Sequence, residues 1–283
     1  MKILVFALTG IGNDLLFHLA SMNWVKVVGL FTVTYANKYP YYECEPLSEL
    51  AKKLEIQTFE NMSLKEPGTL ELIKKLEPDL IVVGSYYDII PSEIISIPNK
   101  GIVNIHPSLL PYYKGPTPTY WVIVNNEKYT GITVHYIDNQ DIDSGPIIYQ
   151  ERFQVPPLCT DGELRKEISE RTGDIIEKAL LIIRTEEPQS IKRQNYSNGS
   201  YYSRNKENLI DLNDNFDYIQ RRVRALTPYP GPIIEVDNKK YWVKQVEKAS
   251  GFSEVTPGWE QETYYISKVG DCFARFILER ITS

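Results

Sequence analysis

Three continuous apolar runs constrain the fold of this chain more than any other feature. They read KILVFAL at residues 2–8, KVVGLFTV at 26–33 and LIVVG at 80–84, and segments with helical spacing separate them. A strand that is apolar at every position is covered on both faces, which is typical of a parallel sheet flanked by helices. The pattern therefore predicts an α/β fold with a doubly wound, mostly parallel sheet.

Two glycines after the first strand raise the question of a dinucleotide site. In a Rossmann-like sheet of this kind, that site needs a third glycine and an acidic residue at the end of the second strand. Gly10 and Gly12 are present, but Leu15 stands where the third glycine would be. Thr32 and Tyr35 lie at the end of the second strand in place of an acid. We therefore interpret the glycines as a tight turn between strand and helix.

Residues 101–145 hold the chain's main concentration of side chains suited to catalysis. A β-branched run carries Asn104 and His106, and their spacing of two puts both side chains on one face of a strand. The acidic loop 138–143, which ends in Asp143, closes the stretch. An amide, an imidazole and a carboxylate brought together can stabilise an oxyanion and move a proton. The sequence predicts the active site here.

The C-terminal part of the chain has a different pattern. A segment rich in Asn, Ser, Gly and Tyr marks a linker at residues 194–203, between one domain at 1–193 and a second at 204–283. The second domain has a short helix and strand-like runs around an Asp-Asn turn, so we expect it to be small and β-rich. It carries 12 basic and 12 acidic residues and is therefore neutral.

The composition limits the possible partners. The formal net charge is −6 and the pI is near 5.3, which gives no general attraction to nucleic acid or to an anionic membrane. The 20 tyrosines, against 9 phenylalanines, suit a pocket for a polar ligand. The 3 cysteines are far apart and predict neither a metal site nor a disulfide framework. The N-terminus reads as a strand rather than a signal peptide, so we expect a cytoplasmic protein.

Four motifs in the central stretch, and one beyond it, resemble a known family. The four are Asn104-Ile105-His106, Ser108-Leu109-Leu110-Pro111, Tyr113-Lys114-Gly115 and Asp143-Ser144-Gly145. In this order they resemble the formyltransferases that use 10-formyltetrahydrofolate, most of all the sugar N-formyltransferases, which are related to methionyl-tRNA formyltransferase. The run RALTPYPG at 224–231 is similar to that family's C-terminal region. The resemblance covers most of the chain and implies a truncated OB-like second domain.

The resemblance implies transfer of a formyl group from 10-formyltetrahydrofolate, as co-substrate, to a primary amine, without a metal. Asn104 would hold the developing oxyanion, His106 would polarise the formyl oxygen, and Asp143 would orient the imidazole and help to take the proton of the amine. The folate would lie between the end of the strand at 80–84 and the acidic loop. Its contacts would be Tyr86, Ile89, Ile90, Ser108, Leu109, Leu110, Pro111, Asp138, Asn139, Gln140, Asp141 and Ile142.

Three kinds of acceptor amine occur in this family: methionyl-tRNA, a glycinamide ribonucleotide and nucleotide-linked amino sugars. Enzymes for the ribonucleotide usually lack a second domain, and a tRNA enzyme should neutralise many phosphates with Lys and Arg. The net charge and the neutral second domain therefore favour a nucleotide-linked amino sugar, with methionyl-tRNA as the alternative. A folate-binding regulatory module with a dead site is the non-enzyme alternative, which the complete Asn/His/Asp set disfavours.

Contacts to a sugar nucleotide are expected near the linker. Tyr201, Tyr202 and Arg204, with the tyrosines of 34–42, could stack on a base and contact phosphate. Lys114 stands where much of the family has Arg, so a point charge replaces a bidentate fork. The same resemblance predicts a possible homodimer and a role in lipopolysaccharide O-antigen biosynthesis. The charge balance predicts no nucleic-acid or membrane partner.

The two remaining histidines are assigned no catalytic step. His135 lies in the strand-like run TGITVHYID and is expected to be structural or to line the pocket. His18 lies in a helical segment and is expected to pack between helices.

Overall fold

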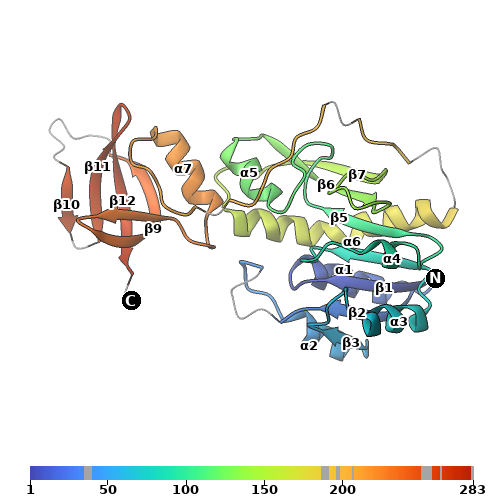
Figure 1. The fold of residues 1–283 in the computed structure, drawn as a ribbon. Coiled ribbons are helices and arrows are strands. Elements are labelled where there is room, and N and C mark those ends of the chain that lie inside the picture. The colour runs from blue at the N-terminus through green and yellow to red at the C-terminus, as the bar shows by residue number, and fades with distance from the viewer. Residues whose placement is uncertain are drawn as a thin grey trace.

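Two β-sheets, one of seven strands and one of five, organise the part of the chain that the structure describes. The structure is a computed structural model, and it describes residues 1–34, 40–185, 191–195, 198–205, 207–249, 257–261 and 263–281. Figure 1 shows the larger sheet with its helices in the N-terminal part, and the smaller sheet to its left in the C-terminal part.

The seven-stranded sheet has the order β3-β2-β1-β4-β5-β6-β7. Its strands are β1 Lys2–Ala7, β2 Lys26–Thr32, β3 Thr58–Glu60, β4 Leu80–Gly84, β5 Ile102–His106, β6 Tyr129–Tyr136 and β7 Ile147–Gln154. The five strands from β3 to β5 are parallel, whereas β6 and β7 are antiparallel to their neighbours. The doubly wound, mostly parallel sheet predicted from the apolar runs is confirmed.

Helices cover both faces of this sheet because its central strands are apolar on both faces. In β1, Ile3 and Val5 pack toward α1 and α6, while Leu4 and Phe6 pack on the opposite side with residues of α3 and α4. The helices of this domain are α1 Ile11–Ser21, α2 Leu47–Lys53, α3 Pro67–Leu76, α4 Ser92–Ile95, α5 Pro118–Val124 and α6 Asp161–Thr185. The full apolar run of a buried strand thus supplies two cores at once.

The glycines after β1 allow a close approach between β1, α1 and α2. Gly10 has a φ of 107°, in the left-handed region that favours glycine. A Cβ on Gly12 would lie 2.9 Å from the Cβ of Ala7 and 2.8 Å from the Leu47 side chain. The interpretation of these glycines as a tight turn from strand to helix agrees with this packing.

The second sheet is antiparallel, with the order β10-β11-β12-β9-β8. It follows α7 Phe216–Ala225 and consists of β8 Ile233–Val236, β9 Lys239–Lys248, β10 Gly258–Gln261, β11 Tyr264–Val269 and β12 Cys272–Arg280. Asp237 and Asn238 both have positive φ, 51° and 60°, as the tight turn between β8 and β9 requires. The small β-rich region expected from the sequence is present.

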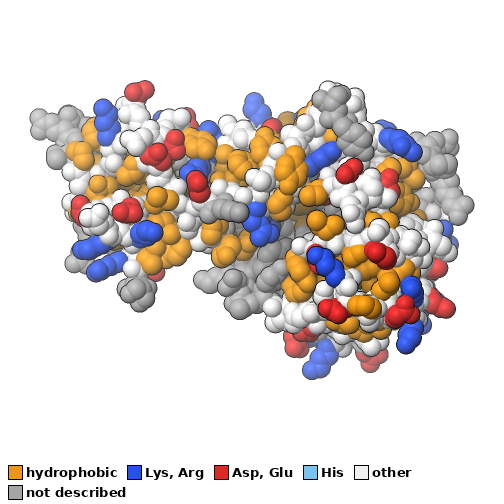
Figure 2. All heavy atoms as spheres, viewed as in Figure 1, with side chains coloured by type: hydrophobic (Ala, Val, Ile, Leu, Met, Phe, Trp, Pro, Cys, Tyr) orange, Lys and Arg blue, Asp and Glu red, His pale blue; other side chains and the backbone are white. Residues whose placement is uncertain are grey.

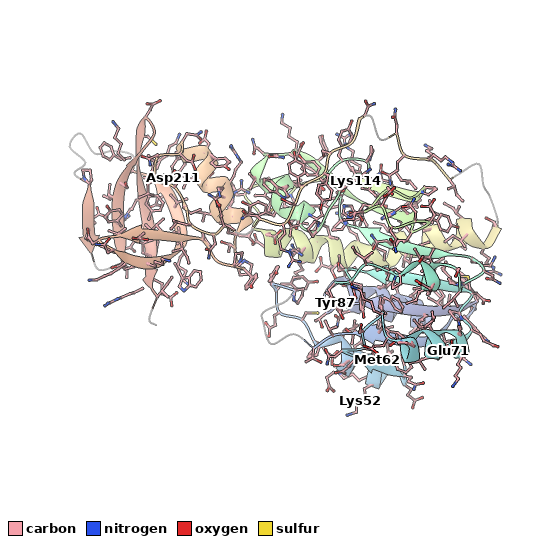
Figure 3. All side chains as sticks on the ribbon, in the orientation of Figure 1. Lys52, Met62, Glu71, Tyr87, Lys114 and Asp211 are labelled. Atoms are coloured by element: carbon pink, nitrogen blue, oxygen red, sulfur yellow. The ribbon has the colours of Figure 1, made fainter. Side chains whose placement is uncertain are left out.

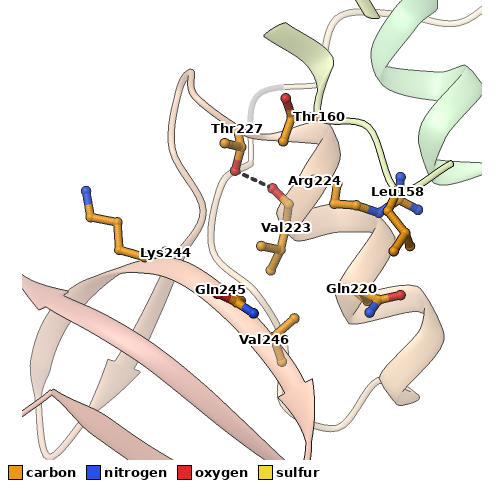
Figure 4. A pocket seen from close by; sticks show the side chains of 9 residues that line it. All are labelled: Leu158, Thr160, Gln220, Val223, Arg224, Thr227, Lys244, Gln245 and Val246. Carbon is orange, nitrogen blue, oxygen red and sulfur yellow. Dashed lines mark hydrogen bonds between the residues drawn. The ribbon is translucent and has the colours of Figure 1, made fainter. Parts of the chain in front are cut away.

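The two parts of the chain meet through α7 and the segment that enters α6. Arg221 Nε donates to the carbonyl oxygen of Val124 in α5 at 2.8 Å, and Arg224 Nη1 donates to that of Cys159 at 2.9 Å. A cavity of about 250 Å³ lies at this junction, between α7, β9 and the loop before α6 (Figure 4). None of the candidate catalytic residues lines it.

Candidate active site

Strand β5 carries Asn104 and His106 on the same face, as the spacing of two predicts. Ile102, two residues before Asn104, packs in the core beside α3 and α4, so the two polar side chains continue an apolar row at the carboxyl end of the strand. The His106 residue is only 4% exposed, and Asn104 is partly buried. Carboxyl ends of parallel strands are where open α/β sheets bind their ligands.

Asp143 joins these residues from the loop between β6 and β7. Its Oδ2 lies 3.5 Å from His106 Nδ1, and its Oδ1 accepts a long hydrogen bond of 3.5 Å from Asn104 Nδ2. The backbone N–H of Gly115 donates to Oδ2 at 2.8 Å. The structure therefore brings the amide, imidazole and carboxylate predicted from the sequence into one cluster.

A backbone carbonyl sets the tautomer of His106. Its Nε2 lies 2.8 Å from the carbonyl oxygen of Tyr113, which only accepts hydrogen bonds, so Nε2 carries a proton. In the neutral ring, Nδ1 is then the unprotonated nitrogen, and it faces Asp143. His106 can therefore take up a proton at Nδ1 with a carboxylate beside it.

Burial and charge act against each other in this pair. Burial lowers the pKa of His106, and the Asp143 carboxylate and the Tyr113 carbonyl only partly offset it. For Asp143, burial opposes ionisation, but the positive charge that His106 and His135 carry when protonated, together with the Gly115 amide, outweighs burial and holds its pKa well below the usual range. Asp143 is therefore the negative member of the pair, while burial favours the neutral form of His106.

His135 belongs to the same cluster, although the sequence suggested a structural or pocket-lining residue. Strands β5 and β6 pair with Asn104 opposite His135. His135 Nδ1 donates to the Tyr136 carbonyl at 2.9 Å, and in the neutral ring Nε2 can then accept from Asn104 Nδ2 at 3.1 Å. Nε2 also lies 3.7 Å from Asp143 Oδ1. The pairing of β5 with β6 brings His135 into the cluster, and the alternating sequence pattern of β6 is the signal that could have predicted it.

The arrangement suits attack of an amine on a carbonyl carbon. Such a reaction develops negative charge on oxygen and positive charge on nitrogen together. Asn104 can donate to the oxygen once it releases its long hydrogen bond of 3.5 Å to Asp143. His106 can transfer a proton through Nδ1, and Asp143 supplies a fixed negative charge for the cation. Each role lies with a group within 3.5 Å of another member of the cluster.

The predicted folate contacts lie on three segments around this cluster. At the end of β4, Tyr86 packs on Phe6 with ring centroids 5.4 Å apart, and Ile90 is buried, whereas Ile89 is 59% exposed. Residues 138–142 are exposed, and Ile142 is 46% exposed. Contact of these two segments with folate stays a prediction.

The third segment, 108–111, is more deeply buried. Ser108 is fully buried, and its hydroxyl donates to the carbonyl of Tyr112 at 2.8 Å. Leu110 is 3% exposed, and its N–H donates to the Thr133 hydroxyl at 3.2 Å, while Leu109 and Pro111 are partly exposed. Ser108 and Leu110 therefore pack inside the domain, and contact of the segment with folate stays a prediction.

The predicted substrate residues of the linker lie beside the turn that follows Pro111. Lys114 and Tyr201 form a backbone bridge, and Tyr201 is 56% exposed. Tyr202 stacks on Tyr113 and on Trp121, with centroids 5.2 and 4.9 Å apart. Figure 3 shows Lys114 on the N-terminal domain and Asp211, beyond the linker, beside α7.

The remaining predicted contacts are only partly described. Arg204 is exposed at the end of the linker. Of the tyrosines of 34–42, Tyr35 and Tyr39 lie outside the described residues. Tyr41 stacks on Tyr229 of the second domain, with ring centroids 5.0 Å apart and planes at 12°. His18 lies 3.4 Å from Glu177, which places it between α1 and α6 as expected.

Among the described residues, no group of three or more His, Cys, Asp and Glu side chains is placed to hold a metal ion. Every helix in the described ranges is too short or too polar to cross a bilayer.

Comparison with known proteins gives two family matches that together cover both domains. The sequence profile described as formyl transferase matches residues 1–180, and the profile of the formyl transferase C-terminal domain matches residues 203–271. Methionyl-tRNA formyltransferase of Syntrophus aciditrophicus is 29% identical over 226 residues, which are 80% of this chain and 71% of that protein.

Two solved structures are similar over nearly the whole chain. One is WlaRD, a sugar 3N-formyl transferase, in the presence of dTDP and 5-N-formyl-THF, with a TM-score of 0.69 and 23% identity over 100% of this chain and 98% of the other. The second is the N-formyltransferase from Helicobacter canadensis with folinic acid and dTDP-3-aminofucose, with a TM-score of 0.72 and 21% identity over 98% and 99%. At these identities, the similarity establishes a shared fold.

Proposed function

Because this chain belongs to the formyl transferase family, we propose that it transfers the formyl group of 10-formyltetrahydrofolate to the amine of a nucleotide-linked amino sugar. The family, the α/β fold class and the enzyme class predicted from the sequence are confirmed by the family matches. A folate as formyl donor agrees with the two similar structures, whose ligands include 5-N-formyl-THF and folinic acid.

The contacts of Asp143 are the observation that carries the proposed chemistry. One carboxylate lies 3.5 Å from both the imidazole of His106 and the amide of Asn104, at the carboxyl end of β5. We assign Asn104 to the oxyanion, His106 to proton transfer, and Asp143 to the charge that builds up on the amine and the imidazole. The folate contributes the formyl group; binding and proton handling fall to the residues of this chain.

The charge distribution supports a small acceptor. A tRNA acceptor requires many phosphate contacts from Lys and Arg. The net charge is −6, and on the face shown in Figure 2 the basic side chains are scattered among acidic ones. A nucleotide-linked sugar needs one aromatic surface and one or two cations, which Tyr201, Lys114 and Arg204 can provide. Because both faces of the Tyr202 ring meet other rings, we assign stacking on a base to the exposed Tyr201.

Methionyl-tRNA is the alternative acceptor, because relatives in sequence carry that activity in their names. We also keep the domain limits 1–193, 194–203 and 204–283 as a proposal. Homodimerisation and a role in O-antigen biosynthesis stay predictions from the resemblance, and a cytoplasmic location stays a prediction from the N-terminal sequence.

Turnover measurements test the proposal. We expect release of tetrahydrofolate when the protein is incubated with 10-formyltetrahydrofolate and one of a panel of nucleotide-linked amino sugars. Replacing Asn104 by Ala should raise the barrier by roughly 3 kcal/mol, a loss of about a hundredfold or more in rate. His106→Asn and Asp143→Asn should abolish transfer in a folded protein. Turnover with methionyl-tRNA alone would show that the proposed acceptor is wrong.

A further inference from the structure

The linker contacts the loop that carries Asp143. Just before it, Lys192 and Ile147 exchange two backbone hydrogen bonds of 2.8 Å, which place the chain beside the start of β7. The buried side chain of Gln194 then donates from Nε2 to the carbonyl oxygens of Asp143 and Gly145, at 2.9 and 2.8 Å. A single amide thus holds the backbone at two points of the Asp-Ser-Gly loop.

Further along, the linker pairs with the turn at residues 113–115. The Lys114 N–H donates to the carbonyl of Ser200, and the Tyr202 N–H donates to the carbonyl of Lys114, both at 2.9 Å. The Ser200 hydroxyl accepts from the N–H of Tyr113 at 2.9 Å. In Figure 1 the described part of the linker runs along the side of the N-terminal domain that carries β6 and β7.

That turn contacts both members of the imidazole–carboxylate pair. The Tyr113 carbonyl accepts from His106 at 2.8 Å, and the Gly115 N–H donates to Asp143 at 2.8 Å. Tyr113 and Asp143 themselves have φ values of 58° and 50°, in the left-handed region. Residues other than glycine keep that conformation only where surrounding contacts hold it. The linker supplies a contact at both positions.

We propose that Gln194 and Ser200 are positioning residues, and that the linker sets the distance between His106 and Asp143 through them. Gln194 acts on Asp143 through the loop backbone. Ser200 acts on His106 through Tyr113. The proposal rests on the assignment of His106 and Asp143 to catalysis under the proposed function. It extends the active site to a segment that neither domain match covers completely, since the matches end at residue 180 and resume at 203.

The pKa of His106 depends on the distance between its ring and the Asp143 carboxylate. Asp143, His135 and Lys114 are the charged or titratable groups that act on His106, and the carboxylate is the one that favours the imidazolium. If Asp143 moves away, burial, His135 and Lys114 all still favour the neutral ring. The limb of a pH–rate profile that reports His106 therefore moves to lower pH, whichever protonation state is the active one.

Gln194→Met is the informative variant, because it keeps the length and apolar volume of the side chain and removes the donor. We expect kcat to fall about tenfold to a hundredfold, as for a small displacement of a catalytic group, with little change in KM for either substrate. Asn208→Ala is the matched control. Asn208 Nδ2 donates to the Gly231 carbonyl at 3.0 Å, so this variant also removes an amide-to-carbonyl bond, but one in the second domain. It should leave kcat and the pH profile unchanged.

Histidine NMR gives a readout that does not require turnover. The chain has 3 histidines, so the ring signal of His106 can be assigned by substitution. In Gln194→Met, and in Ser200→Ala, His106 should titrate at lower pH than in the wild type. Ser200→Thr keeps the hydroxyl and should restore the wild-type titration. A general loss of stability would lower the unfolding midpoint without this selective shift and rescue.

The outcomes separate this inference from the proposed function. Wild-type His106 titration in both Gln194→Met and Ser200→Ala would overturn the inference, whatever the activity. A shifted titration in these variants and a wild-type titration in Asn208→Ala would support it. If the wild type turned over no nucleotide-linked amino sugar, the proposed acceptor would be wrong, and the titration would still decide the role of the linker.

Discussion

Asp143 is an ionised carboxylate whose side chain is only 12% exposed. Such a charge is stable only where donors surround it. Here the Gly115 N–H and the Asn104 amide are the donors, and the His106 ring lies within reach. The negative charge is therefore in place before any substrate arrives, which is the arrangement that electrostatic catalysis favours. The reaction adds positive charge next to it.

The buried imidazole predicts how stability depends on pH. Burial lowers the pKa of His106 below the ordinary histidine value of about 6.5, so the unfolded chain binds more protons as the pH falls through that value. The free energy of unfolding then decreases with falling pH. We expect the wild type to lose more stability between about pH 7 and pH 5 than His106→Gln does, as measured by urea unfolding at both pH values. Equal losses in the two proteins would contradict this sign.

At the scale of elements, the antiparallel pair β6 and β7 brings the Asp143 loop to the end of β5. Gly131 permits the close packing of this pair, because a Cβ there would overlap the carbonyl oxygen of Glu151 and the Leu109 side chain. Gly131→Ala should therefore destabilise the protein by about 1–3 kcal/mol, as overpacking does.

The matched control is Gly68→Ala in α3, where a Cβ would meet nothing within 4 Å. This change should be neutral or stabilise by up to about 1 kcal/mol through helix propensity. Denaturant midpoints measure both variants. Equal effects of the two substitutions would show that close packing at Gly131 does not limit stability.

The elements that the sequence predicts well are those whose pattern is local. The apolar runs predicted β1, β2 and β4. Helix α5 was not predicted, since PTYWVIV is rich in β-branched and aromatic residues that are typical of strands. Strand β10 was also not predicted. Its four residues are too few for a periodic pattern.

The residues of the candidate site also divide into those that the local sequence predicts and those that it does not. Asn104 and His106 could be predicted because two residues on one strand share a face, and Asp143 because it completes a motif. Gln194 could not, because its partners are backbone carbonyls about fifty residues away, at separations of 51 and 49. Nothing in the local sequence marks a glutamine in a polar linker as buried. Contacts between distant backbone and a lone side chain follow from the fold as a whole.

For the whole molecule, the charge balance favours a nucleotide-linked amino sugar, the acceptor of the proposed function, over methionyl-tRNA. The chain has net charge −6, with a neutral second domain of 12 basic and 12 acidic residues. Long nucleic acids bind by releasing counterions from many phosphates, whereas a nucleoside diphosphate sugar has two phosphates to contact. A protein with this charge balance gains little from a long polyanion and can still bind a short one through a few cations.

The salt dependence of kcat/KM tests this distinction. We expect log(kcat/KM) for the nucleotide-linked sugar to fall with log[salt] with a slope of magnitude about 2 or less, because the number of neutralised phosphates limits the slope. Lys114→Ala and Arg204→Ala should each reduce the slope where their cation contacts a phosphate. Gly68→Ala, which changes no charge, should leave it unchanged. With methionyl-tRNA as acceptor, a slope several times steeper would mean that many basic side chains contact phosphate. The charge argument for a sugar nucleotide would then be wrong.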